Sequence, residues 1–443
     1  MNVKHWSATR ILAVGFALMI LLGGVLLSMP IANRSGTDIS FLNALFTSTS
    51  ATCVTGLVVF DTWTQFTVLG QVIILLLIQI GGLGFMTVAI LFSLAVGRRI
   101  GLRERSLLAE AVSSTQVGGV VRLVRRTLIG TAIIEGTGAV LLAIRFIPLF
   151  GPGQGIWYGV FHSVSAFCNA GFDLMGIRAP FSSLSHFSGD SLVVLTIAFL
   201  IIIGGIGFMV WNDLIDCRFH PGRLKLHTRS VLVATLGLIF VGTLLLWLFE
   251  RNGVLLGMSP GEQALNAFFQ SVTPRTAGYN TVDMASMSES GKLLTMFLMF
   301  IGAAPGSTGG GVKVTTLSVI IATVFASFRN NEDICMWRHR IDAETMRRAF
   351  TSVAVYIMLT LGGVFVLCAE GYTLTASAFE CLSAIGTVGL TTGITPSLPP
   401  LSKSVLIALM YAGRVGSLTV FLAVARSSSC SKLKNPFGKI VIG

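Results

Sequence analysis

Long apolar stretches separated by short polar ones dominate the chain. Six uncharged stretches each approach or exceed the ~20 residues that a membrane-spanning helix needs, and they occupy 11–33, 62–97, 191–211, 230–249, 293–312 and 349–369. Two further stretches, at 127–144 and 404–425, each contain one ionisable residue. The pattern therefore predicts eight membrane-spanning helices. The first stretch is followed by no small-residue cleavage site, so we expect a span there and not a signal peptide.

Four small polar patches, each containing a glycine, recur within this apolar chain. They read Cys53-Val54-Thr55-Gly56-Leu57, Cys168-Asn169-Ala170-Gly171-Phe172, Arg275-Thr276-Ala277-Gly278-Tyr279 and Gly386-Thr387-Val388-Gly389-Leu390. Their central glycines lie 115, 107 and 111 residues apart. A phenylalanine stands ten residues before each glycine, at Phe46, Phe161, Phe268 and Phe379. Such regular spacing indicates one structural unit used four times.

A second motif follows each patch and supports the same period. It reads IGGLGFM at 80–86, IGGIGFM at 203–209, IGAAPG at 301–306 and AGRVG at 412–416. Each unit is read as a first span, a short amphipathic helix, a polar strand and a second span. We therefore predict an all-α polytopic membrane protein whose four parallel units surround a pseudo-fourfold axis. The predicted boundaries are 1–105, 106–222, 223–335 and 336–426, followed by a tail over 427–443.

The short segment before each patch cannot cross a membrane, as 43–52 illustrates. It can enter as a half-helix and return as an extended strand, because nonhelical backbone is tolerated at membrane depth where it is buried or lines a water-filled cavity. Four such strands on one axis present rings of carbonyl oxygens that can replace the hydration shell of a cation. The alternative is that the patches are ordinary outer loops. Four glycines in register favour a pore.

The charge distribution predicts how the chain is oriented. The whole chain carries 31 Lys and Arg against 19 Asp and Glu, and only 11% of its residues are charged, far below the ~25% of soluble domains. With the N-terminus inside, the inner segments hold 22 basic and 8 acidic residues, and the outer segments hold 7 and 10. This bias fits the positive-inside rule and predicts that both termini are cytoplasmic. The basic excess is thus a topology signal and does not indicate nucleic-acid binding.

With the four patches, the whole chain resembles the Trk/Ktr/HKT superfamily of potassium uptake proteins. The patches look like degenerate potassium-channel filters, and Gly386-Thr387-Val388-Gly389 stays nearest the common form. Eight spans make the chain similar to the membrane subunits of bacterial Ktr systems. The resemblance implies a homodimer in the bacterial cytoplasmic membrane. It also implies control by a cytosolic ring of RCK-domain subunits, which bind ATP or ADP. Potassium is the implied ion, and sodium dependence is common in Ktr systems.

A glycine-rich stretch interrupts the second span of the third unit. It comprises Gly302, Ala303, Ala304, Pro305, Gly306, Ser307, Thr308, Gly309, Gly310 and Gly311. Proline and several glycines make a poor helix interior, and a break at this depth is typical of transport pathways. The alternatives are a kinked helix or a flexible loop across the pore, and the resemblance implies a gating loop. The spacing up to Lys313 does not match a phosphate-binding loop.

Five further ionisable residues have both a functional and a structural interpretation. Arg414 is charged at membrane depth, so it either forms an electrostatic barrier below the filter or bonds to backbone carbonyls. The resemblance favours the pore-lining role. Glu135 either binds a cation or, as we prefer, contacts a neighbouring helix. Asp173 and Asp283 either attract cations at the outer mouth or are solvated, and we expect His162 to be a satisfied residue beside the filter.

Two other functions compete with potassium uptake. A secondary transporter for another cation or small solute would use the broken helix as its binding site, but such carriers usually have two-fold repeats. A membrane enzyme would need a catalytic set, and the sequence has no HExxH motif, paired carboxylates within a span or Ser-His-Asp set. The seven cysteines are scattered without a CxxC pair, so we expect free thiols and neither disulfides nor a zinc site.

Overall fold

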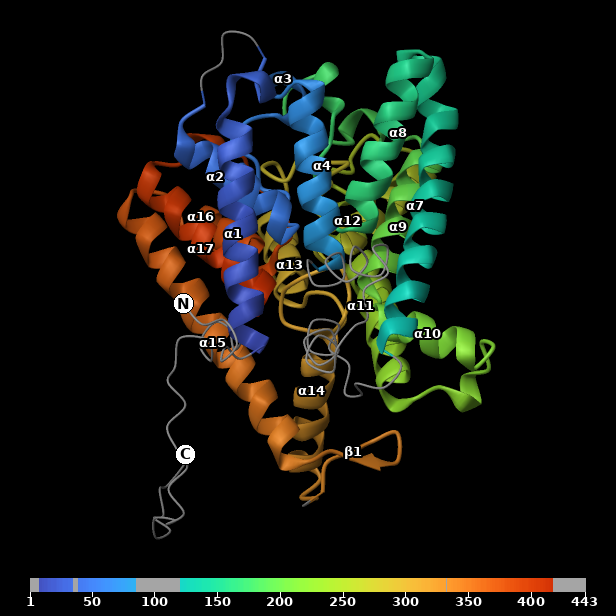
Figure 1. Cartoon of the computed structure of the whole chain (residues 1–443). Helices are drawn as coiled ribbons and strands as arrows, with labels where there is room; N and C mark the ends of the chain where they lie inside the picture. Colours follow the sequence, from blue (N-terminus) through green and yellow to red (C-terminus); the bar gives the residue numbers. More distant parts are fainter. Residues whose placement is uncertain (1–7, 35–38, 85–119, 332, 417–443) are drawn as a thin grey trace.

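The computed structural model describes residues 8–34, 39–84, 120–331 and 333–416. Within these ranges the protein is mostly helical (Figure 1). The main helices are α1 (Ala8–Ser28), α2 (Phe41–Cys53), α4 (Val68–Leu83), α7 (Val120–Phe150), α8 (Pro152–Phe167), α9 (Ser191–Gly205), α10 (Phe208–Asp216), α11 (Leu226–Glu250), α12 (Pro260–Val272), α13 (Glu289–Phe300), α14 (Val314–Phe328), α15 (Ala343–Ala369), α16 (Leu374–Gly386) and α17 (Pro400–Val415).

Short elements complete the connections between these helices. They are α3 (Thr62–Gln65), the 3-10 helices η2 (Pro30–Ala32), η3 (Met175–Ile177), η4 (Ser185–Phe187), η5 (Pro221–Arg223) and η6 (Thr395–Ser397), and the strands β1 (Cys335–Met336) and β2 (His339–Arg340). The two strands pair antiparallel, with Cys335 opposite Arg340. This hairpin lies at the far end of α14 and α15, which extend together beyond the other helices (Figure 1).

Four helices are long and apolar enough to cross a membrane among the described residues: α1, α7, α11 and α15. Their outward faces carry large apolar side chains, and Phe240 and Phe365 are 73% and 74% exposed. Water would disfavour such faces, but the hydrocarbon of a bilayer does not. The chain is therefore a multi-pass membrane protein.

Each long helix packs against the shorter helix that follows it in sequence, giving the pairs α1–α2, α7–α8, α11–α12 and α15–α16. Glycines of the long helices allow the close approach. A methyl group on Gly23, Gly138 or Gly242 would come within 2.4 to 2.6 Å of the hydroxyl of Ser48, Ser163 or Ser271. The same hydroxyls donate to main-chain carbonyls of the long helices, at Ile20, Glu135 and Ile239. Close backbone packing and an interhelical hydrogen bond thus fix the first three of these four pairs.

The second predicted span of each unit, which follows the glycine patch, connects neighbouring units. The helices α4, α9, α13 and α17 pack against α8, α12, α16 and α2, respectively, so these contacts close a ring. All four of the short helices α2, α8, α12 and α16 end near the middle of this ring, where buried Ser and Thr side chains are frequent. The ring places the four glycine patches around one axis.

The second span expected over 191–211 is divided in the structure. Helices α9 and α10 meet at an angle of 88°. The bend falls at Gly207, whose φ is +93°, a conformation that glycine adopts without strain. The main-chain N–H of Phe208 donates to the carbonyl of Gly306 at 2.9 Å instead of continuing the helix. A tertiary hydrogen bond therefore accounts for a break that hydropathy does not reveal.

Several predicted features fall outside the described residues. They are the end of the predicted first unit at 105, its continuation from 85, the end of the last span at 417–425 and the tail over 427–443. The six cysteines that the structure describes are free thiols, as predicted, and the seventh, Cys430, lies in the tail.

Candidate functional site

The four patch glycines form a closed ring through mutual contacts. A methyl group on Gly56 would lie 2.6 Å from the carbonyl oxygen of Ala170, and one on Gly171 would lie 2.5 Å from that of Ala277. The series continues from Gly278 to the Val388 oxygen at 2.4 Å and from Gly389 to the Thr55 oxygen at 2.3 Å. Four carbonyl oxygens therefore alternate with four glycines around one centre. No larger residue fits at these glycine positions without displacing main chain.

The backbone of the four strands is left-handed at matching positions. The glycines have φ between +67° and +94°, and the residue two before each also has a positive φ, at Val54, Asn169, Thr276 and Thr387. Residues other than glycine seldom adopt this conformation, which is found where the surrounding structure enforces it. Ordinary surface loops would not repeat the same unusual backbone four times.

Buried hydroxyl groups hold the strands in this conformation. The main-chain N–H groups of Gly56 and Gly389 donate to the hydroxyls of Ser50 and Ser383 at 3.0 Å. In the second strand, the Ser165 hydroxyl donates to the carbonyl of Phe172 at 2.8 Å. Hydrogen bonds of this kind satisfy buried backbone groups that have no water to bond. The N–H groups of the strands therefore do not need the carbonyl oxygens of the ring as acceptors.

The predicted interruption of the second span in the third unit is present between α13 and α14. Residues 301–313 leave the helix and fold back on themselves, with Ile301 bridged to Val312. The main-chain N–H of Gly302 donates to the Val312 carbonyl at 2.8 Å. We call residues 301–313 the intramembrane loop. It is a loop and not the kinked helix that the sequence left as an alternative.

The intramembrane loop contacts the inner ends of three of the strands. The Thr308 hydroxyl donates to the carbonyl of Phe167 at 3.2 Å, and the N–H of Gly310 donates to the Thr387 hydroxyl at 3.1 Å. A methyl group on Gly309 would come within 2.1 Å of the Thr276 hydroxyl. The loop therefore lies directly against the base of the glycine ring.

Arg414 joins the intramembrane loop to the first unit. Its guanidinium donates to the carbonyls of Thr308 and Gly81 and, at 3.0 Å, to that of Gly82. A second cation, Lys313, donates to the carbonyls of Gly309 and Gly310 at 2.8 and 3.1 Å. Neither forms an ion pair with a carboxylate of the described residues. Among the described residues, the hydrogen-bond acceptors of both side chains are thus main-chain carbonyls beneath the ring.

The sequence did not indicate which carbonyl groups accept hydrogen bonds from Arg414. The IGG motif at 80–86 was informative only as a repeat marker, whereas the structure gives its first two glycine carbonyls a binding role. A methyl group on Gly81 would come within 2.0 Å of the Thr52 carbonyl oxygen. The glycines of this motif therefore permit α4 to approach the first strand closely.

Glu135 contacts a neighbouring helix, as preferred from the sequence. Its Oε2 accepts a hydrogen bond from Nε2 of Gln79 in α4 at 3.1 Å. His162 is also satisfied, with Nδ1 2.7 Å from the Tyr158 carbonyl and Nε2 accepting from the N–H of Leu174 at 3.3 Å. Neither residue contacts the glycine ring directly.

The outer acidic residues differ in their surroundings. Asp173 follows the second strand, and its carboxylate accepts from the N–H of Met175 at 2.9 Å. Burial, reinforced by the charge of Asp61, raises the pKa of Asp173 to about 7. Asp283 is exposed and bonds locally to Ala285 and Ser286. Asp173 is therefore a carboxyl group with a near-neutral pKa beside the second strand of the ring.

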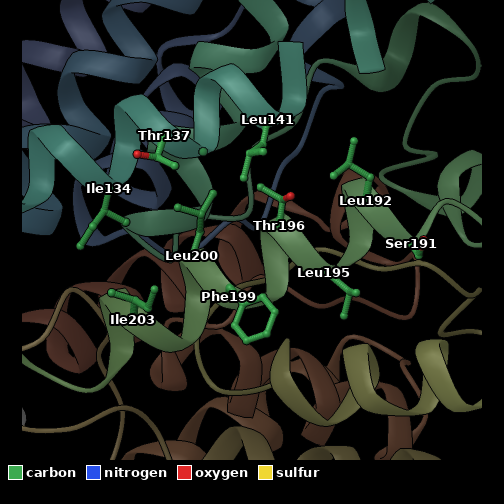
Figure 2. Close-up of a pocket in the computed structure, with 11 residues that line it drawn as sticks. Ile134, Thr137, Leu141, Ser191, Leu192, Leu195, Thr196, Phe199, Leu200 and Ile203 are labelled. Carbon is green, nitrogen blue, oxygen red and sulfur yellow. The ribbon is translucent and has the colours of Figure 1, made fainter. Parts of the chain in front are cut away.

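A cavity of about 480 Å³ lies elsewhere, between α7 and α9 (Figure 2). Its lining is almost wholly apolar, and Figure 2 shows Leu195, Leu200 and Phe199 pointing into it. None of the ring glycines, intramembrane loop residues or buried cations lines it. No group of three His, Cys, Asp or Glu side chains able to hold a metal occurs among the described residues. The glycine ring is therefore the best candidate for a functional site.

Comparisons with known proteins show which family this chain resembles. Residues 14–433 match the family described as TrkH, a cation transport protein. The chain is 41% identical to the potassium/sodium uptake protein NtpJ of Enterococcus hirae, covering 99% of this chain and 98% of that protein. It is 40% identical to the Ktr system potassium uptake protein B of Bacillus subtilis, over 99% and 97% of the two chains.

A solved structure has the same fold. The crystal structure of the potassium transporter TrkH from Vibrio parahaemolyticus superposes with a TM-score of 0.76, over 96% of this chain and 86% of that one. The two sequences are only 19% identical, so this likeness concerns the fold alone.

Proposed function

Because the chain belongs to the TrkH family of cation transport proteins, we propose that it carries potassium ions into the cell through the glycine ring. The family consists of membrane ion transporters and not of enzymes. Relatives that are 41% and 40% identical over nearly the full chain are potassium/sodium and potassium uptake proteins. Potassium is therefore the transported ion in this proposal, and sodium is the second ion to test.

The observation that carries the proposal is the ring of carbonyl oxygens from Thr55, Ala170, Ala277 and Val388, each against a glycine of another strand. Carbonyl oxygens on several sides can replace the water around a monovalent cation. The left-handed backbone at the ring distinguishes it from a set of ordinary loops. We assign the filter to the four strands Cys53–Gly56, Cys168–Gly171, Arg275–Gly278 and Gly386–Gly389.

In this proposal the chain forms four units with eight spans, and both termini face the cytoplasm. The closed ring of helix contacts supports the fourfold arrangement. The charge bias of 22 basic residues inside to 7 outside supports the orientation. Each unit then contributes one half-helix and one filter strand, with the half-helices entering from outside.

The intramembrane loop acts as the gate in this proposal, with Arg414 as its latch. The loop contacts the base of the filter and is held by Arg414 hydrogen bonds to main-chain carbonyls. Opening requires the loop to leave these contacts. The two sequence-based interpretations of Arg414 are compatible here, because the bonds that hold its guanidinium also keep its charge beneath the filter.

Control by another chain and dimer formation complete the proposal. The name of the Bacillus relative assigns it to a Ktr system. We propose that this chain works as a homodimer together with a cytosolic ring of RCK-domain subunits, and that this ring binds ATP or ADP. The hairpin and the end of α15 offer charged cytoplasmic groups for that contact, including Arg340 and Arg348.

Rubidium uptake into proteoliposomes tests the proposed function. Purified protein should accumulate ⁸⁶Rb⁺ down an imposed gradient, and external K⁺ should compete better than Na⁺. The partner chain that copurifies from native membranes should be added in a parallel assay. Entry of an organic solute without Rb⁺ entry would instead establish a secondary transporter of another solute.

A further inference from the structure

We propose that Glu135 is a positioning residue for the second filter strand and contributes to ion selectivity. The inference rests on the proposed function, because selectivity is assigned to that filter. Glu135 lies in the middle of α7 and is only 9% exposed. Its carboxyl group faces α4 and the base of the second strand, and it does not face the surrounding lipid.

Three side chains form the contact. Gln79 bridges the other two, since its Nε2 donates to Glu135 Oε2 at 3.1 Å and its Oε1 accepts from the Cys168 thiol at 3.4 Å. Cys168 Sγ also lies 3.9 Å from Glu135 Oε1. Cys168 is the first residue of the second filter strand. The carboxyl group therefore contacts Cys168 of the filter strand once directly and once through Gln79.

The main chain of Glu135 is attached to the same unit. Its carbonyl accepts a hydrogen bond from the hydroxyl of Ser163 in α8 at 2.6 Å. Because α8 leads directly into the second filter strand, the residue is fixed at both its main chain and its side chain. The position of its carboxyl group relative to Cys168 is consequently well defined.

The bridging residue belongs to a different unit of the ring. Gln79 precedes Gly81 and Gly82, whose carbonyls accept from Arg414. A methyl group on Gly82 would come within 2.8 Å of Cys168 Sγ, so α4 is tightly packed against this side chain. Glu135 thus helps to set the spacing between the first and second units beside the latch.

The chemistry of the site explains why a carboxyl group is present. An ionisable side chain at membrane depth is costly, and it usually serves a pathway or binds a partner. Glu135 is the one carboxyl group away from the ends of the four long helices α1, α7, α11 and α15. It forms no ion pair with any described residue. Its partners are the filter cysteine and the glutamine that bridges to it.

Two other long helices support the base of their own strands in a similar way. Thr235 of α11 accepts from the Arg275 guanidinium at 3.2 Å. The Tyr356 hydroxyl of α15 donates to the carbonyl of Ile385, immediately before the fourth strand. Glu135 occupies the corresponding role in α7. These three side chains differ in chemistry, and of the three only Glu135 has a side-chain hydrogen bond to a residue of another unit.

The test compares Glu135→Leu and Glu135→Gln with Thr137→Leu, which removes a polar group from the exposed side of the same helix. Each protein is reconstituted, and inhibition of ⁸⁶Rb⁺ uptake by K⁺ and by Na⁺ is measured. Loss of a buried hydrogen bond should lower K⁺/Na⁺ discrimination about five- to tenfold in Glu135→Leu. Glu135→Gln keeps an oxygen acceptor and should stay within about twofold of the parent, as should Thr137→Leu.

Unchanged discrimination in well-assembled Glu135→Leu protein would overturn this inference while leaving the proposed function intact. A parent protein that carries no Rb⁺ would overturn both. If Glu135→Leu does not assemble, Gln79→Leu breaks the bridge from the other side and should relax discrimination equally. The Cys168→Ala single variant and its combination with Gln79→Leu complete the test. Additive effects of Gln79→Leu and Cys168→Ala would contradict a shared contact, whereas a double variant no worse than the more affected single variant supports it.

Discussion

At the scale of single residues, the site depends mainly on main-chain atoms, which the identity of a side chain does not reveal. The ring consists of main-chain oxygens and glycine Cα atoms, and the latch consists of one guanidinium bound to carbonyls. Substitution therefore acts by displacing backbone or removing a charge, and not by removing a catalytic group.

The first prediction concerns the ring glycines. In Gly56→Ser the new Cβ would lie 2.6 Å from the Ala170 carbonyl oxygen, so that oxygen must move. We expect K⁺/Na⁺ discrimination, measured by competition against ⁸⁶Rb⁺ uptake, to fall about tenfold or more, as for a change above ~1.4 kcal/mol.

Gly393→Ser is the matched control for the ring glycine. Gly393 has φ +93°, close to the +92° of Gly56, but its Cβ position meets nothing within 4 Å. Both variants impose backbone strain, and only Gly56→Ser disturbs the ring. Equal loss of discrimination in the two variants would argue against the filter assignment.

The second prediction concerns the latch. Arg414→Ala removes a positive charge and three hydrogen bonds to main-chain carbonyls. A barrier lowered by about 1 to 2 kcal/mol would raise K⁺ flux roughly 5- to 30-fold. Flux per correctly assembled protein is the measurement, with assembly checked by size-exclusion chromatography.

Arg414→Lys provides the comparison for this variant, since it keeps the charge but not the forked donor geometry. We expect it to change flux less than alanine does. Well-assembled Arg414→Ala protein that carries K⁺ no faster than the parent would show that the arginine serves packing alone.

At the scale of elements, two kinds of segment surround the proposed pore: tightly packed helix pairs and one loop that interrupts a helix. Small residues allow the helix pairs to approach, and the loop fills the space beneath the strands. The helix pairs should therefore respond to added volume with lost stability, and the loop should respond to shortening with increased flux.

The third prediction compares two glycines of α11. Gly242→Ala would place a methyl group 2.4 Å from the Ser271 hydroxyl, whereas Gly237→Ala meets nothing within 4 Å. Overpacking should destabilise the first variant by about 1–3 kcal/mol, and the second should gain up to about 1 kcal/mol from helix propensity. Thermal unfolding in detergent should show a lowered melting temperature for Gly242→Ala and not for Gly237→Ala. A lowered melting temperature in Gly237→Ala would contradict the packing explanation.

The fourth prediction concerns deletion of Ala303–Gly309 from the intramembrane loop. Its ends are already adjacent, because a methyl group on Gly302 would lie 2.2 Å from the Gly310 carbonyl oxygen. The deletion can therefore close without stretching α13 or α14. We expect faster ⁸⁶Rb⁺ uptake that depends less on the cytosolic partner.

The loop deletion is best compared with Gly371→Ala, which adds backbone strain at φ +95° in the turn between α15 and α16 but meets nothing within 4 Å. That control should leave the rate and its partner dependence unchanged. A folded deletion variant that transports no faster than the parent would exclude occlusion by the loop.

At the scale of the whole molecule, the ring of helix contacts supports the proposal of one pore, and the charge bias supports its proposed orientation. In the proposed topology, the hairpin and the adjoining ends of α14 and α15 lie on the cytoplasmic side, beyond the other helices (Figure 1). Cys335 in this hairpin is exposed, which makes its side of the membrane measurable.

The fifth prediction is that Cys335 faces the cytoplasm. A membrane-impermeant maleimide should label it in inverted vesicles and not in intact cells, with Cys335→Ser identifying the labelled site. Ser286→Cys, at an exposed position in an outer loop, should show the reverse pattern. Labelling of Cys335 from outside would invert the proposed topology.

The class of molecule and the location of its unusual segments follow from the order of the amino acids alone. Apolar runs of spanning length, four glycines at nearly equal spacing and the basic bias are local properties that can be read without coordinates. The loop at 301–313 was predictable for the same reason, since proline and glycine disfavour a helix wherever they occur.

Which atoms meet depends on how the helices pack in three dimensions. The 88° bend at Gly207, the Gly81 and Gly82 acceptors of Arg414 and the bridge from Glu135 through Gln79 to Cys168 join residues of different helices. A carbonyl oxygen is present at every position of a chain, so sequence cannot indicate which ones converge. Their convergence depends on helix packing around the closed ring, and that packing turns four separate glycines into one candidate filter.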